Sequence, residues 1–207
     1  MKTIIWDFDG VILDSNDIKS EAFRIVLSNM PNQSVDEFLK FHKNNGGISR
    51  YIKFKHFFEN ILLTSVSEAD IIQLSNRYSD TVKDLVIQPK LINKDVLDFI
   101  QSNNDIQHHI VSATEDIELK YICLSLDLTK FFVTISGSQN AYTQKHEIVA
   151  NILRIFNNDA VLIGDSINDY HAALKNNIPF ISYNQDEELV KKYNLITFDN
   201  WQKNNII

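Results

Sequence analysis

The stretch TIIWDFDGV, residues 3–11, decides how the rest of the chain is interpreted. Its first four residues are β-branched or aromatic, which is typical of a strand buried on both faces of a parallel sheet. Asp7 and Asp9 follow this strand two residues apart, so in extended geometry their carboxylates lie on the same side, about 6.6 Å from each other. Their mutual repulsion is tolerable where a cation lies nearby. Gly10 then permits a sharp turn of the backbone.

Strands and helices alternate from residue 88 onward. Apolar runs typical of strands occur at residues 106–113, 132–136, 160–165 and 179–182, and helical patterns begin at Lys94, Glu115, Lys145 and Ile167. This alternation predicts an α/β fold with a doubly wound, Rossmann-like parallel sheet and right-handed crossovers. Ligands of such sheets bind beyond the carboxyl ends of the strands, so the residues that follow each strand are the candidates for chemistry.

Residues 15–86 depart from this alternation because their pattern is helical throughout. The segment SVDE, residues 34–37, is a capping box and predicts that a helix begins there. Two adjacent glycines, residues 46–47, interrupt the helical pattern and allow backbone conformations that are closed to other residues. The sequence therefore predicts an all-α domain, inserted into an α/β core that consists of residues 1–14 and 87–207.

The composition of the chain narrows the classes of function. The 207 residues are enough to bury a sizeable core, and the formal net charge is −7. An acidic protein offers no broad basic surface, so nucleic acid is not an expected partner. The single cysteine, Cys123, excludes an intramolecular disulfide and a multi-cysteine metal site. Because there is neither a signal-peptide pattern nor an apolar run long enough to span a membrane, we expect a cytoplasmic protein without a membrane partner.

Three other predicted strand ends carry polar side chains suited to chemistry. Ser112 closes one strand and could donate its hydroxyl to a phosphate oxygen, although Ser112 and Glu115 also form a capping-box pattern. Lys145 opens a helix after a turn-rich segment, where a lysine is usually a solvated charge. Asp165 and Asp169 follow another strand, and two acids at this spacing can converge on a hard divalent cation such as Mg²⁺. A helix cap and an exposed acid are the alternative interpretations of this pair.

Four motifs in this order resemble those of the haloacid dehalogenase superfamily and, within it, the phosphoglycolate phosphatase-like group. DFDGV (residues 7–11) is similar to the first motif, Ser112 to the second, Lys145 to the third and GDSIND (residues 164–169) to the fourth. The resemblance covers nearly the whole chain, and its first and fourth motifs are the specific ones. Residues 15–86 are similar to the small α-helical cap that members of this superfamily carry after the first motif.

The resemblance implies a role for each matching residue. Asp7 would be the nucleophile, and Asp9 the general acid and base. Mg²⁺ would be held by the Asp7 carboxylate, the Asp9 backbone carbonyl and Asp165, with Asp169 as a ligand or directly behind one. The implied substrate-binding residues are Ser112 and Lys145, which would hold the transferring phosphoryl group, with Gly10, Gly47, Arg50 and Ala113.

These residues predict a Mg²⁺-dependent phosphatase that hydrolyses a small phosphate monoester through a phosphoaspartate. Asp9 and a complete fourth motif argue against a dehalogenase, which expels halide without a proton or a metal. Arg50, in the segment GGISR, could clamp an anionic group with its rigid donor fork, or could be a solvated residue of a first helical turn. A phosphonate hydrolase would need a Schiff-base lysine in the cap, and nothing in the sequence marks Lys53 or Lys55 as desolvated.

Two alternatives stay open at this level. A sugar-phosphate mutase would use the same phosphoaspartate but return the phosphate to a sugar intermediate. A phospho-receiver or binding module, which is a different class, also uses an aspartate, magnesium, a hydroxyl and a lysine, but it lacks the helical insertion and an acid equivalent to Asp9. For either enzyme the expected partner is a small phosphorylated metabolite. The sequence decides neither the substrate nor whether the protein is a monomer or a homodimer.

Overall fold

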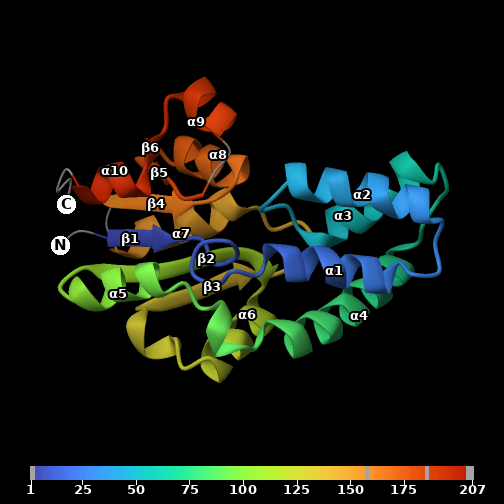
Figure 1. Cartoon of the computed structure of the whole chain (residues 1–207), viewed down its shortest axis with the longest axis horizontal. Helices are drawn as coiled ribbons and strands as arrows, with labels where there is room; N and C mark the ends of the chain where they lie inside the picture. The colour runs from blue at the N-terminus through green and yellow to red at the C-terminus, as the bar shows by residue number, and fades with distance from the viewer. Residues whose placement is uncertain (1–2, 157–158, 185–186, 204–207) are drawn as a thin grey trace.

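The computed structural model describes residues 3–156, 159–184 and 187–203. At its centre, the six described strands form a parallel sheet in the order β3-β2-β1-β4-β5-β6 (Figure 1). The strands are β1 (Thr3–Trp6), β2 (Gln107–Glu115), β3 (Thr134–Ser138), β4 (Ala160–Gly164), β5 (Phe180–Ser182) and β6 (Ile196–Thr197). This order is that of a doubly wound sheet, so the predicted α/β fold class is confirmed.

The register of the sheet places Asp7 at its centre. Trp6, the last residue of β1, pairs with Ile110 of β2 and with Ile163 of β4. The backbone N–H of Asp7 donates to the Ile163 carbonyl at 2.8 Å, which fixes Asp7 beside the end of β4. The strand order reverses between β1 and β4, and doubly wound sheets bind their ligands at this switch point.

Helices cover both faces of the sheet, and the alternation of side chains along β1 divides the core between them. Trp6 packs on one face, where the rings of Phe99 and Phe198 contact it, and Ile5 packs on the other. The first face carries α5 (Lys94–Ser102), α6 (Asp116–Ser125) and α10 (Phe198–Lys203), the second carries α7 (Lys145–Phe156) and α8 (Ile167–Lys175), and α9 (Glu187–Tyr193) connects β5 to β6. Within the described part of the chain, no helix combines the length and the apolar character needed to cross a membrane.

Helices α1 to α4 lie beyond the carboxyl edge of the sheet (Figure 1). They are α1 (Asn16–Val26), α2 (Asn32–Asn44), α3 (Arg50–His56) and α4 (Glu68–Val86), and α3 continues into a π-helical turn, Phe57–Ile61. The helices share an aromatic cluster in which the Phe23 ring contacts those of Phe38 and Tyr78. The helical character predicted for residues 15–86 is therefore confirmed.

Several element boundaries differ from the sequence prediction by one or two residues. Helix α2 begins at Asn32, two residues before the predicted capping box, and no side chain caps its first turn. Pro31 is the residue before the helix, and its carbonyl accepts a helical hydrogen bond from the Val35 N–H at 3.1 Å, so the helix starts directly after it. Strand β3 begins at Thr134 instead of Phe132 and follows a 3-10 turn, Thr129–Phe131, from which Phe132 and Val133 separate it.

Candidate active site

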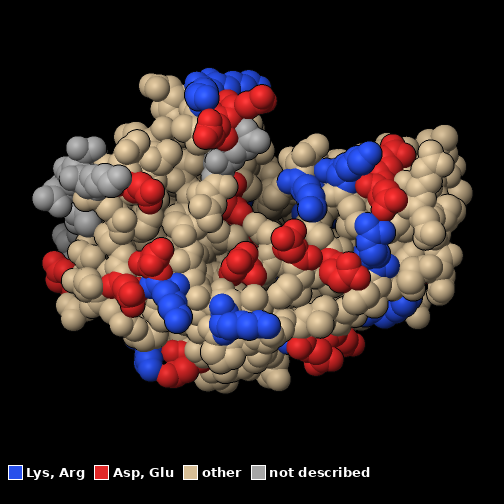
Figure 2. Space-filling model, viewed as in Figure 1, with Lys and Arg blue, Asp and Glu red and all other residues tan. Residues whose placement is uncertain are grey.

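A cavity of about 740 Å³ opens at the carboxyl edge of the sheet, next to α1, α2 and α3. Figure 2 shows the surface hollowed between these helices and the sheet-bearing part of the protein, with acidic side chains inside the hollow and basic ones on its rim. Of the residues predicted for the site, the cavity is lined by Asp7, Asp9, Gly47, Arg50, Ser112, Ala113, Lys145 and Asp165. The other two, Gly10 and Asp169, lie directly behind this lining, against Asp165 and Lys145.

Lys145 joins the acidic side chains at the centre of the cavity. From the first residue of α7, its Nζ donates to Asp7 Oδ1 at 2.6 Å and to Asp169 Oδ1. The other oxygen of Asp169 accepts from the Ser166 backbone N–H at 3.0 Å and from its hydroxyl at 2.6 Å, in the capping box that begins α8. Although burial opposes the charge on Lys145, Asp169 and Asp7 outweigh it and raise the pKa of Lys145, so this lysine stays charged.

Three aspartates beside Lys145 form a cluster that fits a divalent cation. One carboxylate oxygen each from Asp7, Asp165 and Asp169 lies within 4.8 Å of the others. Burial, and after it the charge of Asp169, raises the pKa of both Asp7 and Asp165, that of Asp165 to about 7. When all three are ionised, the carboxylates outnumber the one lysine by two negative charges, which a divalent cation would balance, and carboxylate oxygens are the ligands that Mg²⁺ prefers. The donor set therefore fits the predicted magnesium site.

The connection from β1 to α1 shapes this acidic cluster. Gly10 has a φ of +79°, which other residues rarely adopt, and any side chain there would overlap the Asp165 carboxylate. Asn16, the first residue of α1, donates its Nδ2 to Asp165 Oδ2 at 2.7 Å. Sequence reasoning missed Asn16, whose only signal is its closeness to the first motif. Gly10 thus lets the backbone approach the cluster, while its role in binding substrate stays a prediction.

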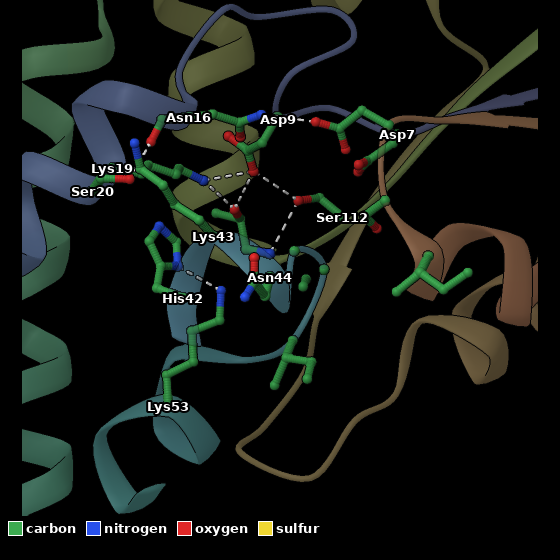
Figure 3. Close-up of a pocket in the computed structure, with 18 of the residues that line it drawn as sticks. Asp7, Asp9, Asn16, Lys19, Ser20, His42, Lys43, Asn44, Lys53 and Ser112 are labelled. Carbon is green, nitrogen blue, oxygen red and sulfur yellow. Dashed lines mark hydrogen bonds and ion pairs between the residues drawn. The ribbon is translucent and has the colours of Figure 1, made fainter. Parts of the chain in front are cut away.

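Asp9 lies in a separate network of hydrogen bonds (Figure 3). Its Oδ2 forms an ion pair with Lys19 Nζ at 2.6 Å and accepts from Thr114 Oγ1 at 3.0 Å. The Ser112 hydroxyl donates to the same oxygen at 3.3 Å, and the Ser15 hydroxyl donates to Oδ1 at 2.6 Å. Burial alone would raise the pKa of Asp9, but Lys19 and the hydrogen bonds outweigh it and lower the pKa, so Asp9 is ionised at neutral pH.

Sequence reasoning missed both Lys19 and Thr114. Thr114 follows Ser112 by two residues in β2, so the strand period of two could have placed both hydroxyls on one side. Lys19 carries no such signal, because it is one of several lysines in a long helical pattern. Ser112 itself belongs to β2, and α6 begins only at Asp116, so the alternative interpretation of Ser112 as a helix cap is wrong.

The loop between α2 and α3 contacts the fourth motif. Gly47 has a φ of +71°, and a side chain there would press against Ser166 and Asn168. The Asn168 side chain donates its Nδ2 to the Gly46 carbonyl. The two adjacent glycines therefore allow the backbone of this loop to lie directly against the strand end that carries Asp165.

Arg50 lines the cavity, but it is paired with a carboxylate of the protein. Its Nη1 donates to Glu118 Oε2 at 2.8 Å and to Ser79 Oγ at 2.6 Å. The guanidinium lies 5.0 Å from the centre of the Tyr78 ring. The ion pair joins α3 to α6 and so connects the helices beyond the sheet edge to a helix on the sheet. That Arg50 clamps a substrate anion stays a prediction.

Glu118→Gln is expected to lower the free energy of unfolding by about 3 kcal/mol, because it leaves the Arg50 charge buried without a counterion. Urea denaturation measures this loss. The matched control is Glu187→Gln, which breaks an exposed pair with Lys191 and should cost less than about 0.5 kcal/mol. Equal effects of the two substitutions would show that the buried ion pair contributes no more to stability than the exposed one.

Lys53 is desolvated, although nothing in the sequence marked it as such. Only 4% of this residue of α3 is exposed, and its amine lines the cavity. Burial, and after it the nearby charge of Lys19, lowers the pKa of Lys53 to about 7. Lys55, two residues later, has a side chain that is 60% exposed and pairs with Glu59. The helix therefore presents one lysine to the cavity and the other to solvent.

A doubly wound sheet with paired aspartates, a charged lysine and an acidic cluster at its switch point is the arrangement of an α/β protein that binds its ligand at the carboxyl ends of the strands. Comparison with known sequences specifies the family. The family model of the haloacid dehalogenase-like hydrolases matches residues 4–183. The chain belongs to this family, as its motifs indicated. No curated protein matches the chain.

Solved structures of the same fold cover nearly the whole chain. A predicted phosphatase from Clostridium acetobutylicum superposes with a TM-score of 0.79 at 18% identity, over 99% of this chain and 98% of that one. β-Phosphoglucomutase from Clostridium difficile gives 0.76 at 21% identity, over 98% and 92%. CbbY from Rhodobacter sphaeroides, solved as a mutant in complex with xylulose-1,5-bisphosphate, gives 0.70 at 16% identity, over 88% and 86%. At these identities the similarity establishes the fold alone.

Proposed function

We propose that the protein is a Mg²⁺-dependent phosphatase that hydrolyses the phosphate monoester of a small metabolite through a phosphoaspartate on Asp7. The observation that carries the proposal is the position of Asp7 in the cavity, with the charged Lys145 beside it and Asp9 nearby in a network of hydroxyls. Phosphoryl transfer asks a protein mainly for alignment and for stabilisation of negative charge. These side chains supply both.

The two aspartates divide the chemistry between them. In the first half-reaction an Asp7 oxygen attacks phosphorus, the bond from phosphorus to the leaving oxygen breaks, and Asp9 gives that oxygen a proton. In the second, the ionised Asp9 takes a proton from the water that attacks the phosphoaspartate, and inorganic phosphate leaves. The low pKa of Asp9 beside Lys19 suits the second step. Movement of α1, which carries Lys19, away from Asp9 would favour the protonated form that the first step needs.

The remaining site residues would stabilise the charge of the phosphoryl group. Asp7, Asp165 and Asp169 would hold Mg²⁺, together with the Asp9 carbonyl that the family resemblance implies. When bound, the cation would offset the negative charge that gathers between the nucleophile and the phosphoryl oxygens. Lys145 adds a fixed positive charge next to Asp7, and the Ser112 hydroxyl adds a hydrogen-bond donor.

We propose that residues 15–86 act as a cap over a core formed by residues 1–14 and 87–207. The cavity lies between these two parts, so closing them would exclude water and restrict the substrate to a small molecule. The structural similarity to β-phosphoglucomutase and to CbbY with its bound bisphosphate supports a phosphorylated sugar or a molecule of that size as the substrate class.

A sugar-phosphate mutase is the second candidate, and the similarity to β-phosphoglucomutase favours it. It would share the phosphoaspartate but return the phosphoryl group to a sugar phosphate instead of to water. A phospho-receiver is less well supported, because a receiver needs neither the helices of residues 15–86 nor an acid placed like Asp9.

Turnover with Mg²⁺ separates these functions. We expect steady release of many equivalents of phosphate per protein from p-nitrophenyl phosphate, and a panel that includes 2-phosphoglycolate and sugar phosphates would then find the preferred substrate. A mutase would convert a sugar phosphate into its isomer and release little phosphate. One equivalent of protein-bound phosphate without turnover would identify a receiver and refute the proposal.

Mg²⁺ is expected to stabilise the protein more at pH 8 than at pH 6. Because the pKa of Asp165 is raised to about 7, this carboxyl is mostly protonated at pH 6, and protons compete there with the cation. In the absence of metal, the folded state keeps this proton between about pH 4 and pH 7 while the unfolded chain loses it, so metal-free stability should fall as the pH rises through that window. At 100 times its Kd, Mg²⁺ would add about 2.7 kcal/mol.

Thermal unfolding with and without Mg²⁺ measures this effect. Asp165→Asn should remove the Mg²⁺-dependent rise in Tm, whereas Asp84→Asn, at an exposed position of α4, should keep it. A rise of the same size in the Asp165→Asn protein would place the cation elsewhere.

A further inference from the structure

Lys53 is the one buried cation of the described chain that lacks a carboxylate partner. The four buried cations are Lys19, Arg50, Lys53 and Lys145. Lys19 pairs with Asp9, Arg50 with Glu118, and Lys145 with two aspartates. Among the residues that the structure describes, Lys53 has no such ion pair. Burial of an unpaired charge is costly, so proteins normally provide a partner.

The hydrogen bonds of Lys53 are also incomplete. An ammonium group has three donors, and one of them reaches His42 Nδ1, 2.8 Å away (Figure 3). Burial, and after it the charges of Lys53 and Lys19, lowers the pKa of His42 to about 3, so the ring is neutral and accepts this bond. No other hydrogen bond of the Lys53 amine occurs within the described residues. Two donors are therefore available to a ligand.

The place of Lys53 in the cavity indicates what kind of ligand it would meet. Lys53 and Asp7 line the same cavity, Lys53 from α3 and Asp7 from the end of β1 (Figure 3). Lys43 and Arg50 line it as well, each paired with a carboxylate, so Lys53 is the basic side chain on the wall formed by α2 and α3 that lacks an ion pair among the described residues. The charges of Asp9 and Asp165 favour the charged form of Lys53, but burial and the charge of Lys19 outweigh them. An anion on this wall would give Lys53 the partner that it lacks.

We propose that Lys53 binds a second anionic group of the substrate, a carboxylate or a phosphate, while the phosphoryl group to be transferred lies at Asp7. The inference rests on the proposed function and narrows its substrate class to phosphate monoesters that carry a further negative charge. His42 orients the amine by accepting one of its hydrogens, which leaves the other two for the anion. The cavity of about 740 Å³ has room for a molecule with two such groups.

The test compares substrates that differ only in the second charge. One pair is 2-phosphoglycolate and 2-hydroxyethyl phosphate, and the other is fructose 1,6-bisphosphate and fructose 1-phosphate. The measured quantity is the ratio of kcat/KM within each pair. We expect the wild-type protein to prefer the compound with the second anion in at least one pair, and the pair that shows this preference identifies the anion as carboxylate or phosphate.

Lys53→Met is expected to lower that ratio by about 10- to 100-fold, the effect of removing one charge-assisted hydrogen-bonding partner. Lys53→Arg keeps a charged donor and should recover part of the preference. The matched control is Lys55→Met, which removes an exposed lysine of the same helix and should leave the ratio unchanged. Since Lys53→Met removes a desolvated charge, its Tm should not fall, and a loss of the preference is then not a loss of folding.

Several outcomes would overturn the proposal. Equal losses on both members of each pair would assign Lys53 a structural role, and a wild-type ratio near one in both pairs would show that no second anion is recognised. Covalent trapping of Lys53 by borohydride in the presence of phosphonoacetaldehyde would make it a Schiff-base lysine instead. If the wild-type protein hydrolyses none of these compounds, nor p-nitrophenyl phosphate, the proposed phosphatase function fails. Calorimetric binding of the same pairs, with and without Lys53→Met, then decides on the anion site by itself.

Discussion

Asp7→Asn is expected to lower kcat for phosphate-ester hydrolysis by at least about four orders of magnitude, because losing a covalent nucleophile removes the chemical route and not only its efficiency. The asparagine amide cannot form the acyl phosphate, although it can occupy nearly the same space between the end of β1 and Lys145. Acid-quenched gels after incubation with ³²P-labelled substrate should show a labelled wild-type protein and an unlabelled variant. Phosphate release measures the rate.

The loss of activity in the Asp7→Asn protein should not be caused by a loss of folding. Burial and the charge of Asp169 raise the pKa of Asp7, so a neutral side chain at this position removes an unfavourable charge, and stability should be unchanged or higher. Asp84→Asn, outside the cavity, should retain full activity. If the Asp7→Asn protein still becomes labelled, the nucleophile is another residue and the proposed mechanism is wrong.

Asp9→Asn is expected to reduce turnover by about 10²- to 10⁴-fold on alkyl phosphates, the usual contribution of a general acid and base. The loss should be smaller in the first half-reaction with p-nitrophenyl phosphate, whose leaving group needs little protonation. The second half-reaction should remain slow for both kinds of substrate, because the attacking water has lost its base. Rapid-quench kinetics should therefore show a burst of p-nitrophenol and an accumulated phosphoprotein.

The hydrogen-bond network around Asp9 allows the Asp9→Asn substitution to test the catalytic role of Asp9 without loss of the fold. An asparagine at this position keeps one oxygen, which can accept from Thr114, and its NH₂ group can donate to the Ser15 hydroxyl, which also accepts, so the fold of the β1–α1 connection should survive. Lys19 loses its counterion, which circular dichroism and the Tm would register. Near-normal turnover of an alkyl phosphate by the Asp9→Asn protein would disprove the assignment of Asp9 as the acid and base.

The basic side chains of the cavity differ in their partners within the protein, and these partners determine which side chains are available to a substrate anion. Lys145 lies between two aspartates and is fixed as part of the acidic centre. Arg50 is fixed by Glu118, which makes it a connection between helices in this arrangement. Lys53 has only a neutral histidine. A substrate anion would therefore compete with a protein carboxylate at Arg50 but with none of the described carboxylates at Lys53.

The fold and much of the site could be predicted because both depend on local patterns. The run of residues 3–6 and the alternation after residue 88 are properties of short segments, and parallel strands bring their carboxyl ends to one edge by necessity. This is why the sequence alone predicts that Asp7, Ser112 and Asp165 lie together. The start of α2 was mispredicted because the first helical hydrogen bond is accepted by the Pro31 backbone carbonyl, which carries no side-chain signal, and not by the capping box at residues 34–37.

By itself, the sequence determined the doubly wound sheet, the helical insertion, the family and the residues at the strand ends, since these follow from periodicity and from motifs read along the chain. Only the tertiary structure decided which charged side chains pair. Lys19 forms an ion pair with Asp9, Glu118 forms one with Arg50, and Lys53 forms none with a carboxylate of the described residues. The physical reason is that burial and ion pairing join residues far apart in the chain, through the packing of α1, α3 and α6. The sequence pattern around a helical lysine is the same whether its amine faces solvent or a cavity, so the pattern does not distinguish the two positions.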